Sequence, residues 1–232
     1  MSLQILPLVG IGPVRPGDEV TEFLATALEP LEPARGDVLV VTHKIVSKAE
    51  GRVVTIQGDA EEFKRAVVEA EAASIVRRRG ALIIAETRHG FICANAGVDR
   101  SNADPGTMIL LPEDPDLSAH RIRVRLQRRL GVELPVIISD TFGRPWRRGL
   151  TDIAIGVSGL EAVVDLRGTR DWVGRELEVT EIAVADELAS AADLVMGKPD
   201  GVPAALIRGY HGPRGKGRGA DLVRPVDEDL FR

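Results

Sequence analysis

A carboxylate and a hydroxyl stand side by side where an apolar stretch of the chain ends, at Asp140 and Thr141. Oxygen ligands at the end of a strand suit a hard cation such as Mg²⁺, which keeps some of its waters. The next stretch carries guanidinium groups that can neutralise phosphates, on Arg144, Arg147 and Arg148. For these residues alone, a turn made by Asp140 and a set of solvated arginines is an equally good alternative.

A second polar stretch, residues 95–102, contains Asp99 and Asn102. Asp99 can serve as another carboxylate ligand of a metal ion, and the Asn102 amide can donate to a base or a sugar. The pattern N-x-G-x-D-x-x-N is by itself more typical of turn chemistry. It therefore supports a site only in combination with other residues.

Two lysines, Lys44 and Lys48, follow the apolar run at residues 38–41. At helical spacing they share one face, and a helix that begins after a strand attracts anions. The alternative is a solvated basic face, which is somewhat better supported for Lys44 than for Lys48.

The glycine-containing stretch 10–14 allows the backbone to approach a nucleotide closely, although an ordinary β-turn is the alternative. The phosphate-binding P-loop, the serine nucleophile elbow and the zinc-protease pattern do not occur in the sequence. Two acids, a lysine pair, a glycine-containing loop and an arginine-rich loop together fit a site for a metal ion and a polyphosphate.

Strands and helices must place these loops, and they alternate irregularly along the chain. Several strands follow one another through short turns, which favours an α+β fold of mixed, mainly antiparallel sheets with packed helices. We predict one catalytic unit over residues 1–208 and a flexible Gly/Arg-rich segment with a C-terminal tail over residues 209–232. The predicted strands are 3–9, 38–41, two within 81–99, 134–141, 152–160 and 203–209. The predicted helices are 19–29, 43–50, 60–79, 115–129 and 179–197. The predicted loops include 104–116, 142–151 and 209–219.

Composition limits the class of protein. The 232 residues carry a net charge of −5, so no basic excess predicts binding to nucleic acid or to a membrane surface. No apolar run approaches the ~20 residues of a membrane span. The single cysteine, Cys93, excludes an intrachain disulfide, and the N-terminal residues do not resemble a secretion signal. We expect a globular protein of the cytoplasm.

The residues described above also carry a resemblance to the F420 γ-glutamyl ligase family, which spans nearly the whole chain in order. The similar segments are 6–18, 36–52, 95–102, 110–119, 136–156 and 179–198. The resemblance implies that GTP phosphorylates the terminal carboxylate of F420-0 to an acyl phosphate, which the α-amine of L-glutamate attacks. It further implies addition of further γ-linked glutamates, a homodimer, and an α/β protomer of unusual fold.

The resemblance also implies roles for single residues. Asp99 and Asp140 would bind the first of two Mg²⁺ or Mn²⁺ ions and Thr141 the second, with K⁺ as a further cation. The contacts to GTP would come from Ile11, Gly12, Pro13, Val14, His43, Lys48 and Asn102. From their chemistry alone we add Arg144 and Arg147 to Asp140 as candidate catalytic residues.

The second metal has an incomplete ligand set in this sequence. Archaeal members of the family carry an acidic residue near Lys198, and a protonated lysine cannot ligate a cation; Asp200 is the nearest substitute. Two other functions stay open at this point: a metal-dependent phosphohydrolase and a GTP-binding module without catalytic activity.

Overall fold

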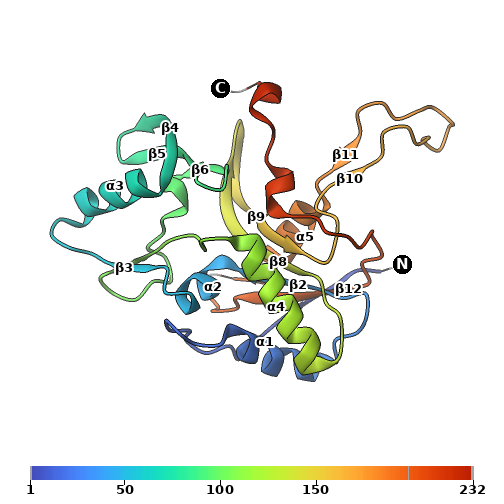
Figure 1. Ribbon diagram of the computed structural model, residues 1–232, viewed down its shortest axis with the longest axis horizontal. Coiled ribbons are helices and arrows are strands. Elements are labelled where there is room, and N and C mark those ends of the chain that lie inside the picture. The colour runs from blue at the N-terminus through green and yellow to red at the C-terminus, as the bar shows by residue number, and fades with distance from the viewer. Residues whose placement is uncertain (1, 198, 231–232) are drawn as a thin grey trace.

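The computed structural model describes residues 2–197 and 199–230. Within these residues, a five-stranded sheet forms the centre of the molecule (Figure 1). In spatial order its strands are β1 (Gln4–Pro7), β12 (Ala204–Arg208), β2 (Val38–Thr42), β8 (Val136–Arg144) and β9 (Arg147–Ser158). β2 and β8 run parallel, and the other neighbours in this sheet pair antiparallel.

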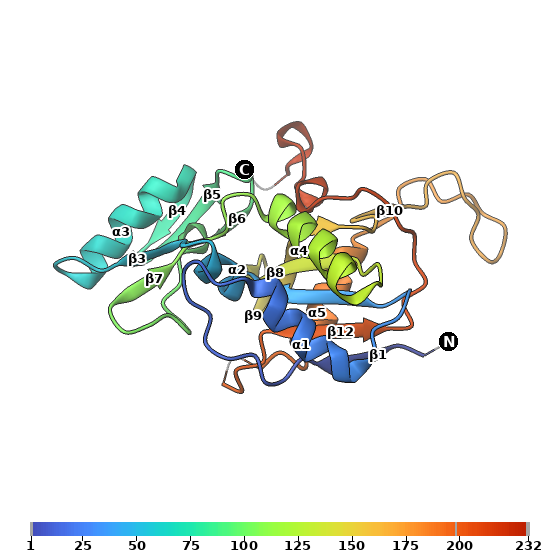
Figure 2. The same ribbon diagram turned by 60° about the horizontal axis from the view of Figure 1, so that its bottom comes forward.

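Helices cover both faces of the central sheet, which explains why β2 is an uninterrupted apolar run. Leu39 and Val41 of β2 face one apolar cluster, which includes side chains of α1 (Val20–Leu28) and α4 (Pro115–Leu130). Val38 and Val40 face a second cluster with α5 (Val184–Asp193). Figure 2 shows α1 and α4 in front of the sheet and α5 behind it.

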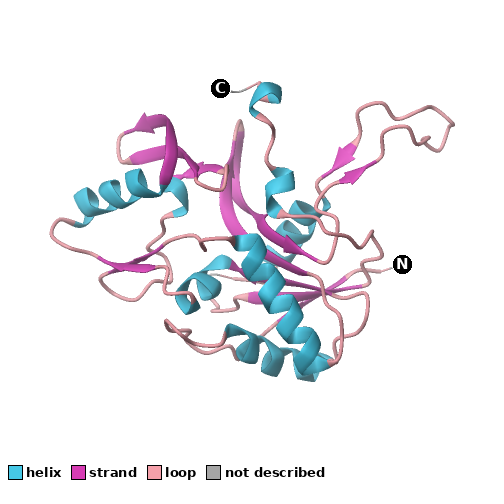
Figure 3. Cartoon of the chain, viewed as in Figure 1, coloured by secondary structure: helices cyan, strands magenta, loops and turns pink. Residues whose placement is uncertain are grey.

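A smaller layer of helix and sheet continues from one end of the molecule, beyond α2 (His43–Ala49) (Figure 3). Its apolar cluster includes Val68, Ile83 and Met108. Its elements are β3 (Val53–Thr55), α3 (Ala60–Glu71), β4 (Ala72–Arg79), β5 (Leu82–Thr87), β6 (Ile92–Ala94) and β7 (Thr107–Ile109). The remaining described elements are β10 (Val164–Asp165), β11 (Glu181–Ile182) and the 3₁₀ helices η1 (Glu29–Leu31), η2 (Asn95–Gly97), η3 (Gly219–Leu222) and η4 (Val226–Glu228).

The predicted fold class is confirmed, and several elements agree with the sequence. The predicted helix 115–129 is α4, which ends at Gly131 with the left-handed φ of 72° that favours glycine. The two strands expected around the His89–Gly90 turn are β5 and β6, which pair antiparallel. No helix of the described ranges 2–197 and 199–230 combines the length and apolarity needed to cross a membrane.

The predicted helix 60–79 is wrong in its second half. The helix ends at Glu71, and residues Ala72–Arg79 form β4, which pairs with β5. The first half is rich in alanine and glutamate, whereas Ile75 and Val76 are β-branched and fit a strand. Pairing with β5 therefore decides the structure of a segment whose charge pattern looks helical.

The predicted loop 142–151 is also wrong, because most of it belongs to a long hairpin. β8 continues to Arg144 and β9 begins at Arg147, with Thr141 paired to Asp152. The residues of this hairpin end are mostly exposed, and Gly, Pro and Arg are frequent among them, so they lack the alternation that predicts a strand. Two smaller differences are that β7 lies inside the predicted loop 104–116, and that α5 is shorter than the predicted helix 179–197.

The segment from residue 209 onward lies against the main body at several points. The Gly217 amide donates to the Leu160 carbonyl at 3.0 Å, and the Gly219 amide donates to Asp116 Oδ1 at 2.7 Å. A side chain at Gly219 would meet the Ile155 carbonyl, since its Cβ would lie 2.3 Å from that oxygen. The domain boundary at residue 208 and the flexibility of the tail stay predictions.

Candidate active site

The segments that carry the candidate residues leave or enter the central sheet on one side, at the edge formed by the ends of the strands. β2 and β8 are parallel neighbours, with Thr42 opposite Ser139, so α2 and the Asp140–Thr141 pair begin side by side. β12 runs antiparallel to β2, and the Thr42 amide donates to the Pro203 carbonyl at 2.8 Å. The end of β1 lies beside the start of β12, which brings residues 8–14 to the same edge.

A cavity of about 400 Å³ opens at this edge. Its wall brings together the residues predicted to contact GTP, except His43, and one residue predicted to bind a metal ion. These wall residues are Ile11, Gly12, Pro13, Val14, Lys48, Asn102 and Thr141. Residues without an earlier assigned role complete the wall, among them Thr42, Lys44, Asp152, Asp193, Met196 and Pro203.

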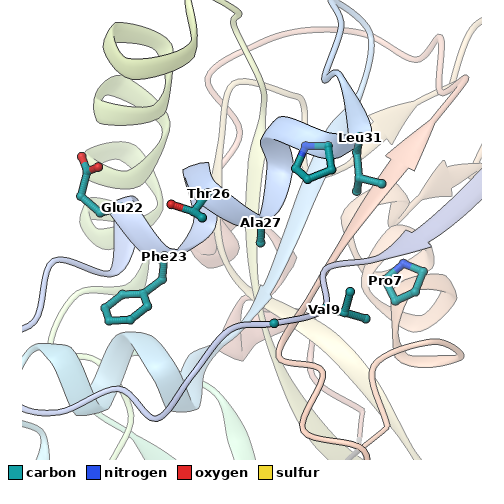
Figure 4. Close-up of a pocket in the computed structure, with 9 residues that line it drawn as sticks. Pro7, Val9, Glu22, Phe23, Thr26, Ala27 and Leu31 are labelled. Carbon is teal, nitrogen blue, oxygen red and sulfur yellow. The ribbon is translucent and has the colours of Figure 1, made fainter.

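A second hollow lies beside the segment that precedes Ile11. It has a volume of about 460 Å³ and is bounded by this segment and by α1 (Figure 4). Its lining is mainly apolar, with Val9, Phe23 and Leu31 prominent. Among the described residues that line it, Glu22 is the charged one, and none is a lysine or arginine that could bind a phosphate. The cavity with Lys48 and Thr141 is therefore the better candidate for phosphate chemistry.

Lys44 is buried and does not belong to a solvated basic face. Its Nζ lies 2.6 Å from Asp99 Oδ2 and donates to the Ser101 carbonyl at 3.2 Å. Burial alone would raise the pKa of Asp99, but the Lys44 ammonium and the Ser101 hydroxyl and amide outweigh it and hold that pKa well below its usual range. A cation that binds Asp99 must share this carboxylate with Lys44 or displace it.

Replacement of Lys44 by Met, which keeps most of the buried stem, is expected to lower stability in a pH-dependent way. In the wild type the pKa of Asp99 is lowered in the folded state, so the Lys44–Asp99 pair stabilises the fold above the ordinary carboxyl pKa of 3.8. That contribution is lost as the pH falls through the lowered value. The difference in free energy of unfolding between wild type and Lys44→Met should therefore be nearly constant from about pH 7 to about pH 5 and shrink as the pH falls below the ordinary carboxyl pKa of 3.8.

Urea unfolding at a series of pH values measures this difference. Lys64→Met, in α3 and outside the cavity wall, is the matched control and should show no such trend. A wild-type advantage that stays constant over the whole pH range would contradict the ion pair.

His43 contacts Asp140 instead of the cavity. Its side chain is fully buried, with Nε2 3.2 Å from Asp140 Oδ1 and Nδ1 3.2 Å from Ser47 Oγ. The Nε2 atom approaches Asp140 closely but without the geometry of a hydrogen bond. His43 is not among the residues that line the cavity, so its contact to GTP stays a prediction.

Asp140 is nearly buried, and its Oδ1 accepts the Thr141 amide at 2.7 Å. Burial, together with the nearby Asp140 carboxylate, raises the pKa of Cys93 to about 12. The Cys93 thiol therefore stays neutral and is a poor nucleophile. The Asp140 carboxylate is therefore the group at this position that can bind a cation.

Asp152 is the residue of this site that the sequence did not reveal. It lies opposite Thr141 in the β8–β9 hairpin and is 3% exposed. Its Oδ1 accepts the Thr141 hydroxyl at 2.7 Å, and its Oδ2 accepts the Ser139 hydroxyl at 2.8 Å. A correct prediction of the hairpin register would have found it, because residues opposite each other on paired strands share a face.

The predicted metal ligands lie on both sides of the hairpin. Asp140 and Thr141 are successive strand residues, so their side chains point to opposite faces. In the part of the chain that the structure describes, no group of three or more His, Cys, Asp or Glu side chains is arranged to hold a metal ion. Mg²⁺ often binds through one or two carboxylates plus waters and substrate phosphates, so Thr141 and Asp152, which both line the cavity, provide suitable oxygen atoms for it there, whereas Asp140 offers its carboxylate on the opposite face.

The structure does not bring the predicted arginines to the cavity. Arg144 and Arg147 pair at the exposed end of the β8–β9 hairpin, and Arg144 Nη2 donates to the Arg148 carbonyl at 3.4 Å. Their catalytic role stays a prediction. Asp200 is exposed in the segment before β12, and Lys198 lies outside the described residues.

Comparison with known proteins gives consistent similarities along the chain. A profile of the family described as F420-0:Gamma-glutamyl ligase matches residues 9–209. The chain is 45% identical to the coenzyme F420:L-glutamate ligase of Methanopyrus kandleri, an alignment that covers 100% of this chain and 98% of that protein. It is 44% identical to the coenzyme F420:L-glutamate ligase of Methanothermobacter thermautotrophicus, with 100% of both chains covered.

Similarity over the full length to enzymes named as ligases defines the class of this protein, which is a ligase. The chain belongs to the F420-0:γ-glutamyl ligase family. This membership confirms the resemblance that the sequence segments indicated.

Proposed function

We propose that this protein joins L-glutamate to F420-0 in the biosynthesis of coenzyme F420, and that GTP drives the reaction. The observation that carries the proposal is the cavity at the sheet edge. It collects the loop 11–14, Lys48, Asn102 and Thr141 in a chain similar over its full length to coenzyme F420:L-glutamate ligases.

The proposed reaction has two steps. A carboxylate oxygen of F420-0 attacks the γ-phosphorus of GTP, so that an O–P bond forms, the bond to the leaving GDP breaks, and an acyl phosphate results. The α-amine of L-glutamate then attacks the carbonyl carbon, a C–N bond forms, and inorganic phosphate leaves with the electron pair of the broken C–O bond. The amine loses a proton in this step.

The cavity residues fit the demands of these steps. Phosphoryl transfer needs alignment and neutralisation of charge more than a covalent nucleophile. Lys48 is half-buried in the wall and can neutralise a phosphate, and the loop 11–14 can approach the nucleotide with its backbone. Asp99, Asp140 and Thr141 would hold Mg²⁺ or Mn²⁺, and of these three only Thr141 belongs to the cavity wall. Two such ions would neutralise the charge of the transferred phosphoryl group.

Further features belong to the same proposal. We propose addition of further γ-linked glutamates, K⁺ as an additional cation, a location in the cytoplasm and a homodimer. The exposed end of the β8–β9 hairpin supports the homodimer, since Trp146 is 80% and Leu150 64% exposed there and a second copy would cover them. A monomeric molar mass in solution would contradict this last point.

The ligation is tested by incubating the protein with F420-0, L-glutamate, GTP and Mg²⁺ or Mn²⁺, followed by mass spectrometry of the product. A product heavier by one glutamyl residue, formed only with nucleotide, is expected. A parallel reaction with ATP measures the base selectivity. No mass increase with either metal would contradict the proposed function, and phosphate release without F420-0 and glutamate would indicate a phosphohydrolase.

Replacement of Lys48 by Ala is expected to raise the KM for GTP by about 10- to 100-fold, the size of one lost hydrogen bond between charged groups. The loss should fall mainly on nucleotide binding, because Lys48 lines the cavity. Steady-state kinetics with varied GTP measures the effect, with Lys64→Ala as the matched control. An unchanged KM for GTP in Lys48→Ala would remove this lysine from the nucleotide site.

A further inference from the structure

Asp152 is a buried carboxylate held by two neutral hydroxyl groups. It is 3% exposed, and Ser139 and Thr141 each donate one hydrogen bond to it. A buried charge is costly unless it is hydrogen-bonded or paired. Asp152 and Thr141 both line the cavity, so this hydrogen-bonded pair lies next to whatever the cavity binds.

The chemistry of a carboxylate fixes the direction of both hydrogen bonds. An ionised carboxylate accepts and cannot donate, so Ser139 and Thr141 must both direct their protons to it. The Thr141 hydroxyl has one proton, which leaves its lone pairs for other partners. Thr141 also lines the cavity, so these lone pairs are available there to a group that needs an acceptor or an oxygen ligand.

Hydrogen bonds to the neighbouring helix, α5, fix the backbone at Asp152. Ser190, in α5, donates its hydroxyl to the Asp152 carbonyl at 2.8 Å, and the Thr151 hydroxyl donates to Ser190 Oγ at 3.0 Å. The backbone of residue 152 is thus tied to α5 while its carboxylate holds β8. Rigid support of this kind is what keeps a ligand oxygen in position.

We propose that Asp152 is a positioning residue, which accepts the hydrogen bond of the Thr141 hydroxyl and so presents the oxygen of Thr141 to a divalent cation in the cavity. The inference rests on the proposed function, in which such a cation accompanies the nucleotide. An amide at position 152 would carry a donor, so one of the two hydroxyls would have to reverse its direction. A neutral side chain of the same shape therefore does not replace the carboxylate.

The test measures binding of Mn²⁺ in the presence of GDP, with free Mn²⁺ followed by electron paramagnetic resonance. Asp152→Asn is expected to weaken Mn²⁺ binding by about 10- to 100-fold, the effect typical of residues that orient a metal ligand. GDP binding measured in EDTA should stay within about twofold of the wild type, which also shows that the variant is folded.

Variants of the hydroxyl residues separate positioning from general damage. Thr141→Val should weaken Mn²⁺ binding as much as Asp152→Asn does, and Thr141→Ser should restore it. The double variant Asp152→Asn/Thr141→Val should be no weaker than either single variant, because both changes remove the same oxygen contact. Ser139→Ala removes the other hydroxyl and should leave Mn²⁺ binding near the wild-type value.

Unchanged Mn²⁺ binding in Asp152→Asn, or equal losses in Ser139→Ala and Thr141→Val, would overturn the inference. A wild type that binds no Mn²⁺ with GDP would overturn it as well. The measurement needs neither F420-0 nor glutamate, so the two proposals can fail separately. A wild type that binds Mn²⁺ and GDP with the expected variant pattern but forms no ligated product would contradict the proposed function alone.

Discussion

Asp140→Asn is expected to lower kcat for glutamate ligation by about 10²- to 10³-fold, the cost of removing one group that stabilises developing charge. Asp140 lies at the sheet edge, nearly buried, with His43 Nε2 at 3.2 Å. In the proposed reaction its carboxylate helps to hold the cation that neutralises the transferred phosphoryl group. Asparagine has the same shape but no charge, so the fold should persist while the cation is held poorly.

Mass spectrometry of the ligated product over time measures this loss, and circular dichroism checks that the variant is folded. Asp227→Asn, an exposed carboxylate in the C-terminal segment, is the matched control and should keep wild-type activity. An Asp140→Asn enzyme within a few-fold of the wild type would rule out the metal role of Asp140.

Asp37→Ala is expected to destabilise the fold by about 2–3 kcal/mol without changing the KM for GTP. Asp37 is 3% exposed and contacts the Arg208 guanidinium, with Nη2 2.9 Å and Nε 3.2 Å from Oδ2. Breaking a fully buried ion pair costs about 3–5 kcal/mol, and the partial exposure of Arg208 reduces this through solvent screening. The pair joins the end of β12 to the start of β2, at the opposite end of these strands from the cavity.

Thermal unfolding measures this effect, and a fall in Tm of about 5–10 °C is expected for a protein of this size. Asp165→Ala is the matched control, because Asp165 forms an exposed pair with Arg167 and its loss should leave Tm unchanged. Equal Tm values for Asp37→Ala and the wild type would show that Arg208 finds sufficient partners in the carbonyls of Leu31 and Glu32.

The sequence predicted the strands of the central sheet because buried strands read as apolar runs, as at residues 38–41 and 134–141. Polar residues directly after those runs indicated the site, and the parallel pairing of β2 with β8 brings Lys48 and Thr141 into one cavity wall. The sequence contains no local signal for that pairing. The combined chemistry of the separate segments predicted one site for a metal ion and a polyphosphate, and the resemblance to a family supported the same combination.

Contacts between distant residues explain what the sequence did not predict. Lys44 meets Asp99 across 55 positions, and neither residue has a local pattern that announces the other. The sequence did not reveal Asp152 because the hairpin end that sets its register is mostly exposed and rich in Gly and Arg, a composition that favours a loop. The sequence predicted a helix for the segment Ala72–Arg79, because the Ala- and Glu-rich segment before it favours a helix. In the structure the segment is a strand that pairs with β5.

Activation of a carboxylate by GTP is tested most directly with F420-0 that carries ¹⁸O in its terminal carboxylate. During ligation the attacking carboxylate oxygen stays with phosphorus when the amine displaces phosphate. Mass spectrometry should therefore find one ¹⁸O atom in the inorganic phosphate released when the first glutamate is added to each labelled F420-0 molecule. Phosphate without ¹⁸O, or a ligated product formed in the absence of nucleotide, would contradict the acyl-phosphate reaction.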